Sequence, residues 1–113
     1  MKSYTQLINL SEDYIEKNLN NKIRLVDIAT NLHISAYHFH RLFHEQTNET
    51  LTHFINRIKL ERSAMLLITN TKISITEIAY SYGYSESSSY SRAFKKYFHV
   101  SPKQYRKARF VNF

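Results

Sequence analysis

The sequence of this chain repeats itself once, and that repeat constrains the fold more than any other feature. When the 113 residues are slid against themselves, they match at an offset of 50 residues, and one extra residue then shifts the offset to 51. A sequence that recurs within one chain predicts two similar structural units. The matched pairs are Leu25 with Ile75, Asp27 with Glu77, Ile28 with Ile78, Ala29 with Ala79, Ser35 with Ser85, Arg41 with Arg92, Phe43 with Phe94, Thr50 with Ser101 and Phe54 with Tyr105.

Glycine and proline are nearly absent, with one of each in the chain. Folds rich in β-turns and loops depend on both residue types, so their scarcity favours helices joined by short turns. Apolar residues also recur at helical spacing. Near the N-terminus, for example, Ile8, Ser11, Ile15 and Leu19 form one stripe. We therefore expect an all-α fold of about seven helices.

Hydroxyl-bearing residues indicate where several of these helices begin. Ser74 and Ser101 each precede a Glu or Gln by three residues, which is the pattern of a capping box. Ser85 is expected to cap a helix that continues to Tyr97. The helix before it is expected to end at Gly83, because glycine adopts a positive φ without steric cost.

Each copy of the repeat predicts a helix-turn-helix, in which the first helix supports a second one that enters the major groove of DNA. We expect an N-terminal lobe over residues 1–49, a long central connecting helix over 50–69 and a C-terminal lobe over 70–113. About 18 helical residues at ~1.5 Å each span roughly 27 Å. When the width of the lobes is added, the two reading helices are expected about 34 Å apart, which is one turn of DNA.

Positive charge is concentrated in the second half of the chain. The formal net charge is +7, yet residues 1–50 carry five basic and six acidic side chains, whereas residues 51–113 carry eleven and three. A one-sided positive field favours a polyanionic partner, with nucleic acid ahead of an anionic membrane. A basic, solvated surface without such a partner is the alternative that charge alone leaves open.

Several other classes of protein are not expected. The absence of cysteine excludes disulfides, thiolate metal ligands and thiol catalysis. The adjacent acids Glu12 and Asp13 lie far along the sequence from the basic half, so an enzyme is not expected. His40 and His44 have a spacing that can hold zinc but lack further ligands, so neither a metal nor a cofactor is expected. Without a long apolar run or a signal-peptide core, the chain is expected to be cytoplasmic and to contact no membrane.

The longer helix of each repeat is expected to present a polar face. Tyr37, His40, Arg41 and His44 share one helical face in the first copy. Arginine can form paired hydrogen bonds with guanine, and histidine, serine and lysine suit base edges or phosphates. For Tyr37, contact with a thymine methyl group and a partly buried packing role both remain open. The residues on the corresponding face of the second copy are Ser88, Ser91, Arg92 and Lys95.

The segment from Ile75 to Arg106 resembles the signature of the AraC/XylS family of transcription regulators. It contains the Ile-Ala pair, the Gly-Tyr turn, Ser-Arg-x-Phe-Lys and Ser-Pro-x-x-Tyr-Arg. Together with the first copy, the resemblance covers about residues 7 to 107. It implies two helix-turn-helix lobes bridged by one long helix, which bind as one chain to two successive major-groove segments. The short length is similar to the MarA/SoxS type, in which this domain is the entire protein.

The resemblance also implies roles for individual residues, and it implies left-handed turns at His33 and Asn48. Arg24 stands at the expected N-cap of the first lobe, where the second lobe has Ser74, so that helix start is expected to be the weaker one. In the second lobe, short serines stand where MarA-like proteins have longer amides, so that lobe is expected to read bases weakly and to anchor on phosphate and shape. The implied base-reading residues are Tyr37, His40, Arg41, Ser87, Ser88, Ser91 and Arg92. The residues implied to contact phosphate or position the helices are Ala36, His44, Lys95 and Lys96.

The function expected from these features is sequence-specific binding of double-stranded promoter DNA by a transcription regulator. The resemblance implies an activator that binds as a monomer and contacts RNA polymerase. The alternative is that the chain is the DNA-binding fragment of a longer, ligand-sensing regulator of the same family.

Overall fold

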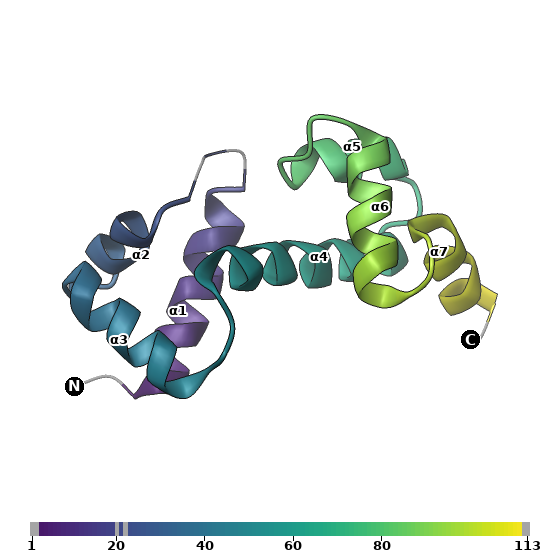
Figure 1. Ribbon diagram of the computed structural model, residues 1–113. Helices are drawn as coiled ribbons and strands as arrows, with labels where there is room; N and C mark the ends of the chain where they lie inside the picture. Colours follow the sequence, from purple (N-terminus) through teal and green to yellow (C-terminus); the bar gives the residue numbers. More distant parts are fainter. Residues whose placement is uncertain (1–2, 20, 22, 112–113) are drawn as a thin grey trace. The chain divides into compact units, whose positions relative to one another are not determined.

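The computed structural model describes residues 3–19, 21 and 23–111, and the side chains of these as far as residue 108. The described residues form helices and turns without a β-strand, which confirms the all-α prediction (Figure 1). The helices are α1 (Tyr4–Lys17), α2 (Leu25–Asn31), α3 (Ala36–Gln46), α4 (Leu51–Thr69), α5 (Ile75–Ser81), α6 (Ser87–Phe98) and α7 (Pro102–Val111).

The chain divides into two compact units. Unit 1 comprises Met1–Ile58 and unit 2 comprises Lys59–Phe113, so the division falls within the long helix α4. Each unit contains one short helix followed by one longer helix, α2 and α3 in unit 1 and α5 and α6 in unit 2. The repeat in the sequence therefore corresponds to a repeat in the structure.

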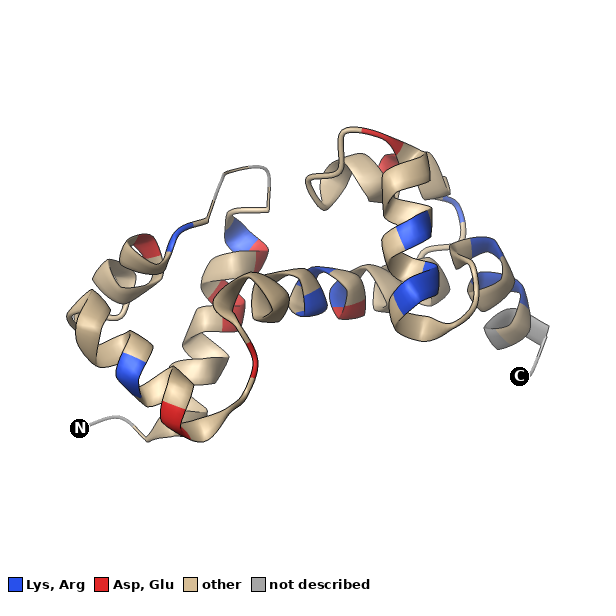
Figure 2. Cartoon of the chain, in the orientation of Figure 1, with Lys and Arg blue, Asp and Glu red and all other residues tan. Residues whose placement is uncertain are grey.

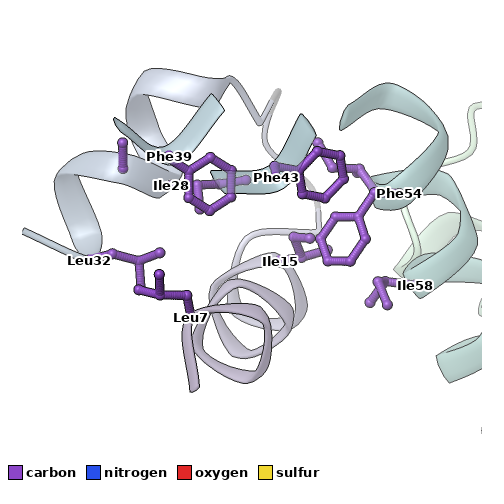
Figure 3. Close-up of a cluster of buried hydrophobic side chains, with 10 residues drawn as sticks. Leu7, Ile15, Ile28, Leu32, Phe39, Phe43, Phe54 and Ile58 are labelled. Carbon is purple, nitrogen blue, oxygen red and sulfur yellow. The ribbon is translucent and has the colours of Figure 1, made fainter. Parts of the chain in front are cut away.

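Unit 1 is built around three phenylalanines. Phe39 and Phe43 project from α3 and Phe54 from α4, and each is at most 6% exposed. The rings of Phe43 and Phe54 meet edge to face, with their centroids 5.2 Å apart. Aliphatic side chains from α1 and α2, including Ile15 and Ile28, complete this core (Figure 3). Its burial fixes which face of α3 remains in solvent.

Helix α1 contributes Leu7, Ser11 and Ile15 to this core. The expected stripe is confirmed, since Ser11 and Ile15 are buried and Ile8 and Leu19 pack half-buried against the core, but it omits Leu7, which is more deeply buried than Ile8. Two adjacent apolar residues satisfy the sequence pattern equally well, and Leu7 continues the four-residue spacing of the other two. The hydroxyl of the buried Ser11 donates to the carbonyl oxygen of Leu7 at 2.7 Å, so its burial leaves no unmet hydrogen bond.

Unit 2 has a more aromatic core. Tyr90 and Phe94 of α6 are fully buried, and the ring of Phe94 lies 5.4 Å from that of Tyr105 in α7. The Tyr90 hydroxyl donates to the Oγ of Ser63 at 2.8 Å, and Ser63 in turn donates to the carbonyl of Leu60. Burial raises the pKa of Tyr90 to about 12, because the apolar surroundings disfavour the charged phenolate.

The tight turn between the two helices has the same form in both units. His33 in unit 1 and Gly83 in unit 2 are left-handed, with φ of 61° and 85°. In each case the next amide donates to the carbonyl five residues earlier, at 3.1 Å and 3.0 Å, which is a Schellman-type helix end. The predictions of a left-handed turn at His33 and of a helix end at Gly83 are both confirmed.

The ends of α3 and α6 differ from each other. The implied left-handed turn at Asn48 is wrong, and the positive φ of 67° occurs instead at its repeat counterpart, His99. After α3, Thr47 is extended and its hydroxyl accepts from the amide of Glu49 at 3.1 Å. This side-chain hydrogen bond turns the chain without a left-handed residue.

Two of the three predicted serine caps are confirmed. The Oγ of Ser74 accepts from the amide of Glu77, and Ser101 forms a reciprocal capping box with Gln104. The prediction for Ser85 is wrong, because Glu86 is the N-cap of α6 and the helix begins at Ser87. The extra residue of the second repeat enters at this turn, and it moves the helix start one position along the chain.

Arg24 is the N-cap of α2, as expected, and its side chain supplies no acceptor for the helix amides. The Asp27 carboxylate accepts instead from the backbone amide and the guanidinium of Arg24, both at 3.1 Å. Hydrogen bonding to that guanidinium lowers the pKa of Asp27. That this helix start is weaker than the one at Ser74 stays a prediction.

Candidate nucleic-acid interface

The outer face of α3 presents the polar side chains that the sequence placed together. Tyr37, His40, Arg41 and His44 are all exposed, because the opposite face of the helix buries Phe39 and its neighbours in the core. Tyr37 is 76% exposed, which excludes the packing role that the sequence left open. Its phenol ring is therefore available for contact with a partner.

Arg41 is held by a carboxylate on the same face. Its Nε donates to Oε1 of Glu45 at 3.1 Å, four residues further along α3. Both side chains remain more than half exposed, at 66% and 53%. The pair borders a hollow of about 380 Å³, whose lining residues are Ser35, Tyr37, His38, Arg41, Leu42 and Glu45.

The two histidines of this face lie one above the other. The rings of His40 and His44 are nearly parallel, with an interplanar angle of 6° and centroids 6.1 Å apart. Both also border a second hollow of about 220 Å³, which reaches the loop before α4 at Asn48 and Thr50. Imidazole nitrogens on an exposed face can donate to phosphate or to base edges.

The outer face of α6 carries more positive charge and shorter polar side chains. Ser88, Arg92, Lys95 and Lys96 are exposed, whereas Tyr90 on the opposite face is buried. Nη2 of Arg92 lies 3.5 Å from the Oγ of Ser89, and no carboxylate among the described residues pairs with this guanidinium. The Oγ of Ser88 is turned toward Glu86 at 3.3 Å. Arg92 is thus held less firmly than Arg41.

The remaining predicted residues lie closer to the core. Ala36 and Ser87 are the first residues of α3 and α6, and both are half-buried, as is Ser91. The first amides of a helix have no partner within it, so such positions suit backbone contact with phosphate. Ser87 and Ser91 consequently offer less accessible hydroxyls for base contact than Ser88 does.

Charge is distributed differently over the two units. Basic residues predominate on α6 and α7, whereas α1 and α3 carry both signs (Figure 2). Residues 1–58 hold six basic and six acidic side chains, and residues 59–113 hold ten and three. Unit 1 is therefore formally neutral, whereas unit 2 is strongly basic.

Sequence reasoning missed the polar side chains that hold the α3–α4 loop. The carboxylate of Glu49 accepts from Nε of Arg57 at 2.8 Å and pairs with Nδ1 of His53 at 2.6 Å. Hydrogen bonding to Arg57 is the largest cause of the lowered pKa of Glu49, and His53 adds to it. The i, i+4 spacing of Glu49 and His53 was the available signal. It shows only that two side chains lie on one face, not that a third joins them.

Arg106, the last residue of the resembling segment, has a structural role. Its Nε donates to the carbonyl of Leu67 at 2.8 Å and its Nη2 to that of Asn70 at 3.1 Å. These carbonyls belong to the C-terminal end of α4, where backbone acceptors lack helical partners. Arg106 therefore ties α7 to α4 within unit 2.

No helix in residues 3–19 or 23–111 is both long and apolar enough to cross a membrane. In the same residues, no three His, Cys, Asp or Glu side chains lie close enough together to hold a metal ion.

Comparison with known proteins places the chain among transcription regulators. Residues 28–108 match the family model described as a helix-turn-helix domain. The Msm operon regulatory protein of Streptococcus mutans is 36% identical over 100 residues, covering 88% of this chain and 36% of that protein. The raffinose operon transcriptional regulatory protein RafR of Pediococcus pentosaceus is 30% identical over 104 residues, covering 92% of this chain and 37% of that protein.

A solved structure agrees with these sequence matches. The C-terminal domain of AraT, a response regulator from Geobacillus stearothermophilus, is 31% identical with a TM-score of 0.71, and the match covers 91% of this chain and 85% of that domain. The chain spans little more than a third of the length of the two operon regulators. The family model matches most of the chain, and the sequence therefore belongs to the AraC-type helix-turn-helix family of DNA-binding transcription regulators.

Proposed function

We propose that this chain recognises a specific sequence in double-stranded DNA by inserting α3 and α6 into two successive segments of the major groove. The observation that carries this proposal is the equivalence of the two outer faces. Each belongs to the second helix of a helix-turn-helix, and each presents an exposed arginine at the same position of the repeat, Arg41 and Arg92. A helix-turn-helix presents its second helix to the bases.

In unit 1, the proposed reading residues are Tyr37, His40 and Arg41. Arg41 is suited to the O6 and N7 acceptors of guanine, and the exposed phenol of Tyr37 to a thymine methyl group. Ala36 at the start of α3 and His44 near its end contact the phosphates on either side. The mixed chemistry of this face supports readout of base edges, since bare phosphate binding needs only positive charge.

In unit 2, Arg92 reads a base, and the three serines Ser87, Ser88 and Ser91 contribute weaker contacts. A serine hydroxyl donates or accepts equally well, so it discriminates little between bases. Lys95 and Lys96 bind phosphate, which adds affinity on any sequence. The larger share of the salt-dependent binding therefore comes from this unit.

The protein acts on promoter DNA as a monomer, because one chain already carries two reading helices. We further propose that it is an activator and that it contacts RNA polymerase through surface outside the two reading faces. The named relatives are bacterial regulators of operons, which supports a role at promoters. Because its proposed partner is bacterial promoter DNA, the protein acts in the cytoplasm of a bacterium. It regulates by binding and carries out no catalytic step.

Selection of bound sites from random duplexes, followed by footprinting, tests this function. We expect one asymmetric protected stretch of about two helical turns, with base preferences in two blocks about one turn apart. Analytical ultracentrifugation of the complex is expected to give one chain per duplex. A palindromic site occupied by two chains, or no enrichment of any sequence, would contradict the proposal.

The length of the relatives favours a second candidate, in which this chain is the DNA-binding part of a longer regulator that senses a ligand. The chain spans 36% of the Msm operon regulatory protein. The mass of the protein isolated with an antibody against unit 2 separates the two candidates. A mass near 13.5 kDa supports the stand-alone regulator. A mass two to three times larger supports the longer one.

A further inference from the structure

The two reading helices differ at one position in a way that the repeat makes visible. Glu45 lies four residues after Arg41 on α3, and Lys96 lies four residues after Arg92 on α6. The offset of 51 residues makes Glu45 and Lys96 counterparts, just as it does the two arginines. Unit 1 therefore places a carboxylate where unit 2 places an ammonium group.

Glu45 is poorly placed to stabilise its own helix. It lies in the last turn of α3, where the helix dipole disfavours a negative charge, whereas Lys96 in the corresponding turn is favoured. In the pair with Arg41 the acid follows the base along the helix, which is the weaker of the two orders. Both side chains are more than half exposed, and such pairs contribute little to folding.

Glu45 is also poorly placed for simple attraction to DNA. It shares the outer face of α3 with Tyr37 and Arg41, and these three side chains border one hollow. A carboxylate on a surface that approaches phosphates weakens binding on every sequence. Because Glu45 favours neither helix stability nor general affinity for DNA, its presence on this face is better explained by a role in specificity.

The hydrogen bond with Arg41 supplies that role. Glu45 accepts from Nε of Arg41, which leaves the two terminal nitrogens of the guanidinium to donate to a base. A guanidinium already held in place loses less side-chain freedom when it binds the O6 and N7 atoms of guanine. The carboxylate also competes with phosphate for the arginine. In the described part of the chain, Arg92 has a serine hydroxyl at 3.5 Å and no carboxylate that could hold it in the same way.

We propose that Glu45 is a specificity-determining residue, which positions Arg41 for guanine and lowers affinity for other DNA. Lys96 does the reverse in unit 2, where it adds affinity on any sequence. This inference rests on the proposed function, because it needs a chain that selects a DNA sequence.

The test compares Glu45→Gln with Asp13→Asn, a control on the exposed surface of α1 that changes the net charge by the same amount. Binding of each variant to the selected site and to a random duplex is measured at one salt concentration. We expect Glu45→Gln to reduce the ratio of specific to random affinity about fivefold, with the loss confined to one guanine. Asp13→Asn is expected to leave the ratio unchanged.

A double-mutant cycle separates positioning from other roles of Glu45. In the Arg41→Ala background, Glu45→Gln is expected to cause no further loss of specificity, because it acts through the arginine. Thermal unfolding is expected to show that Glu45→Gln is as stable as the parent or slightly more so, since it removes an acid from a helix end. A drop in melting temperature that accounts for the lost binding would overturn the proposal.

Three further results have distinct meanings. An unchanged ratio for Glu45→Gln overturns the positioning role while leaving the DNA-binding function intact. Lost preference for a neighbouring cytosine, with the guanine preference retained, overturns it in favour of direct base contact by Glu45. A parent chain that itself prefers no sequence overturns the proposed function, and the inference with it.

Discussion

Units 1 and 2 share one architecture but differ in how they are held together and in charge. Unit 1 buries aliphatic side chains around three phenylalanines, and its loop is held by the ion pair of Glu49 with Arg57. Unit 2 packs a continuous set of aromatic rings and is held by hydrogen bonds that include the neutral one from Tyr90 to Ser63 and those of the Arg106 guanidinium to backbone carbonyls. Unit 1 is neutral and unit 2 strongly basic. The difference indicates that a duplicated fold can divide reading and affinity between its copies.

The largest expected effect is on the aromatic core of unit 2. Phe94→Ala removes a fully buried ring that contacts Tyr90, Phe98 and Tyr105, and is expected to cost about 3–5 kcal/mol of unfolding free energy. Urea unfolding measures the total loss of unfolding free energy, and amide hydrogen exchange shows which helices lose stability. Protection is expected to fall in α5 and α6 but to persist in α2 and α3. An equal loss in both units would contradict their division.

The next prediction concerns the charge difference. If Lys95 and Lys96 bind phosphate, replacing both with alanine is expected to lower the steepness of log K against log salt by about 2. The preference for the selected site over random DNA is expected to stay the same. Lys17→Ala, on the exposed surface of α1, serves as the control and should leave the slope unchanged. An altered base preference in the double variant would mean that these lysines read sequence.

The two units are also expected to respond differently to pH. The pKa of Glu49 is lowered, so its carboxylate stabilises the fold above its ordinary value of 4.5 and this contribution is lost as the pH falls further. Glu49→Gln is expected to cost about 1 kcal/mol at pH 7 and progressively less below pH 4.5. Denaturant titrations at pH 7 and pH 3.5 measure this change.

Tyr90→Phe provides the matched measurement in unit 2. The pKa of Tyr90 is raised to about 12, so its hydroxyl stays protonated across that range. We expect a cost of about 1 kcal/mol that is the same at both pH values. A cost that varied with pH for Tyr90→Phe but not for Glu49→Gln would reverse the assignment of ionic and neutral contacts.

The smallest expected effect is at the two equivalent turns. His33 adopts a left-handed conformation that Gly83 adopts without steric cost. His33→Gly is therefore expected to stabilise the protein by about 0.5–1 kcal/mol, whereas Gly83→Ala is expected to destabilise it by a similar or larger amount. Melting temperatures of the two variants, measured against the parent, decide this. A destabilised His33→Gly would mean that the imidazole makes a stabilising contact.

Helix positions, the tight turns and most caps could be predicted because they depend on local chemistry. The central helix expected over 50–69 is α4 (Leu51–Thr69), and the hydroxyl of Ser101 accepts from the amide of Gln104 at the start of α7. The start of α6 could not be predicted, because the repeat alignment does not show on which side of Ser85 the inserted residue enters the turn. The structure has Glu86, not Ser85, as the N-cap. Leu7 and Ile8 are similarly indistinguishable until a core selects one of them.

The reading faces could also be predicted, because burial of Phe39 and Phe43 on one side of α3 leaves the other side exposed. The partners of those exposed residues could not. That Arg41 donates to Glu45, or that Arg106 caps α4 from another helix, depends on side-chain conformations and tertiary contacts. Repeat alignment was the signal that would have singled out Glu45, through the opposite charge of Lys96.

The most direct test of the division between the units is the site preference of Arg41→Ala beside that of Arg92→Ala. Each variant is expected to lose about 1–3 kcal/mol on the selected site. Arg41→Ala should abolish the preference for one guanine in the block read by unit 1 and leave the other block unchanged. Arg92→Ala should cause a smaller loss of base preference than Arg41→Ala does. Equal losses on selected and random DNA for Arg41→Ala would make it a phosphate contact, and would contradict the account.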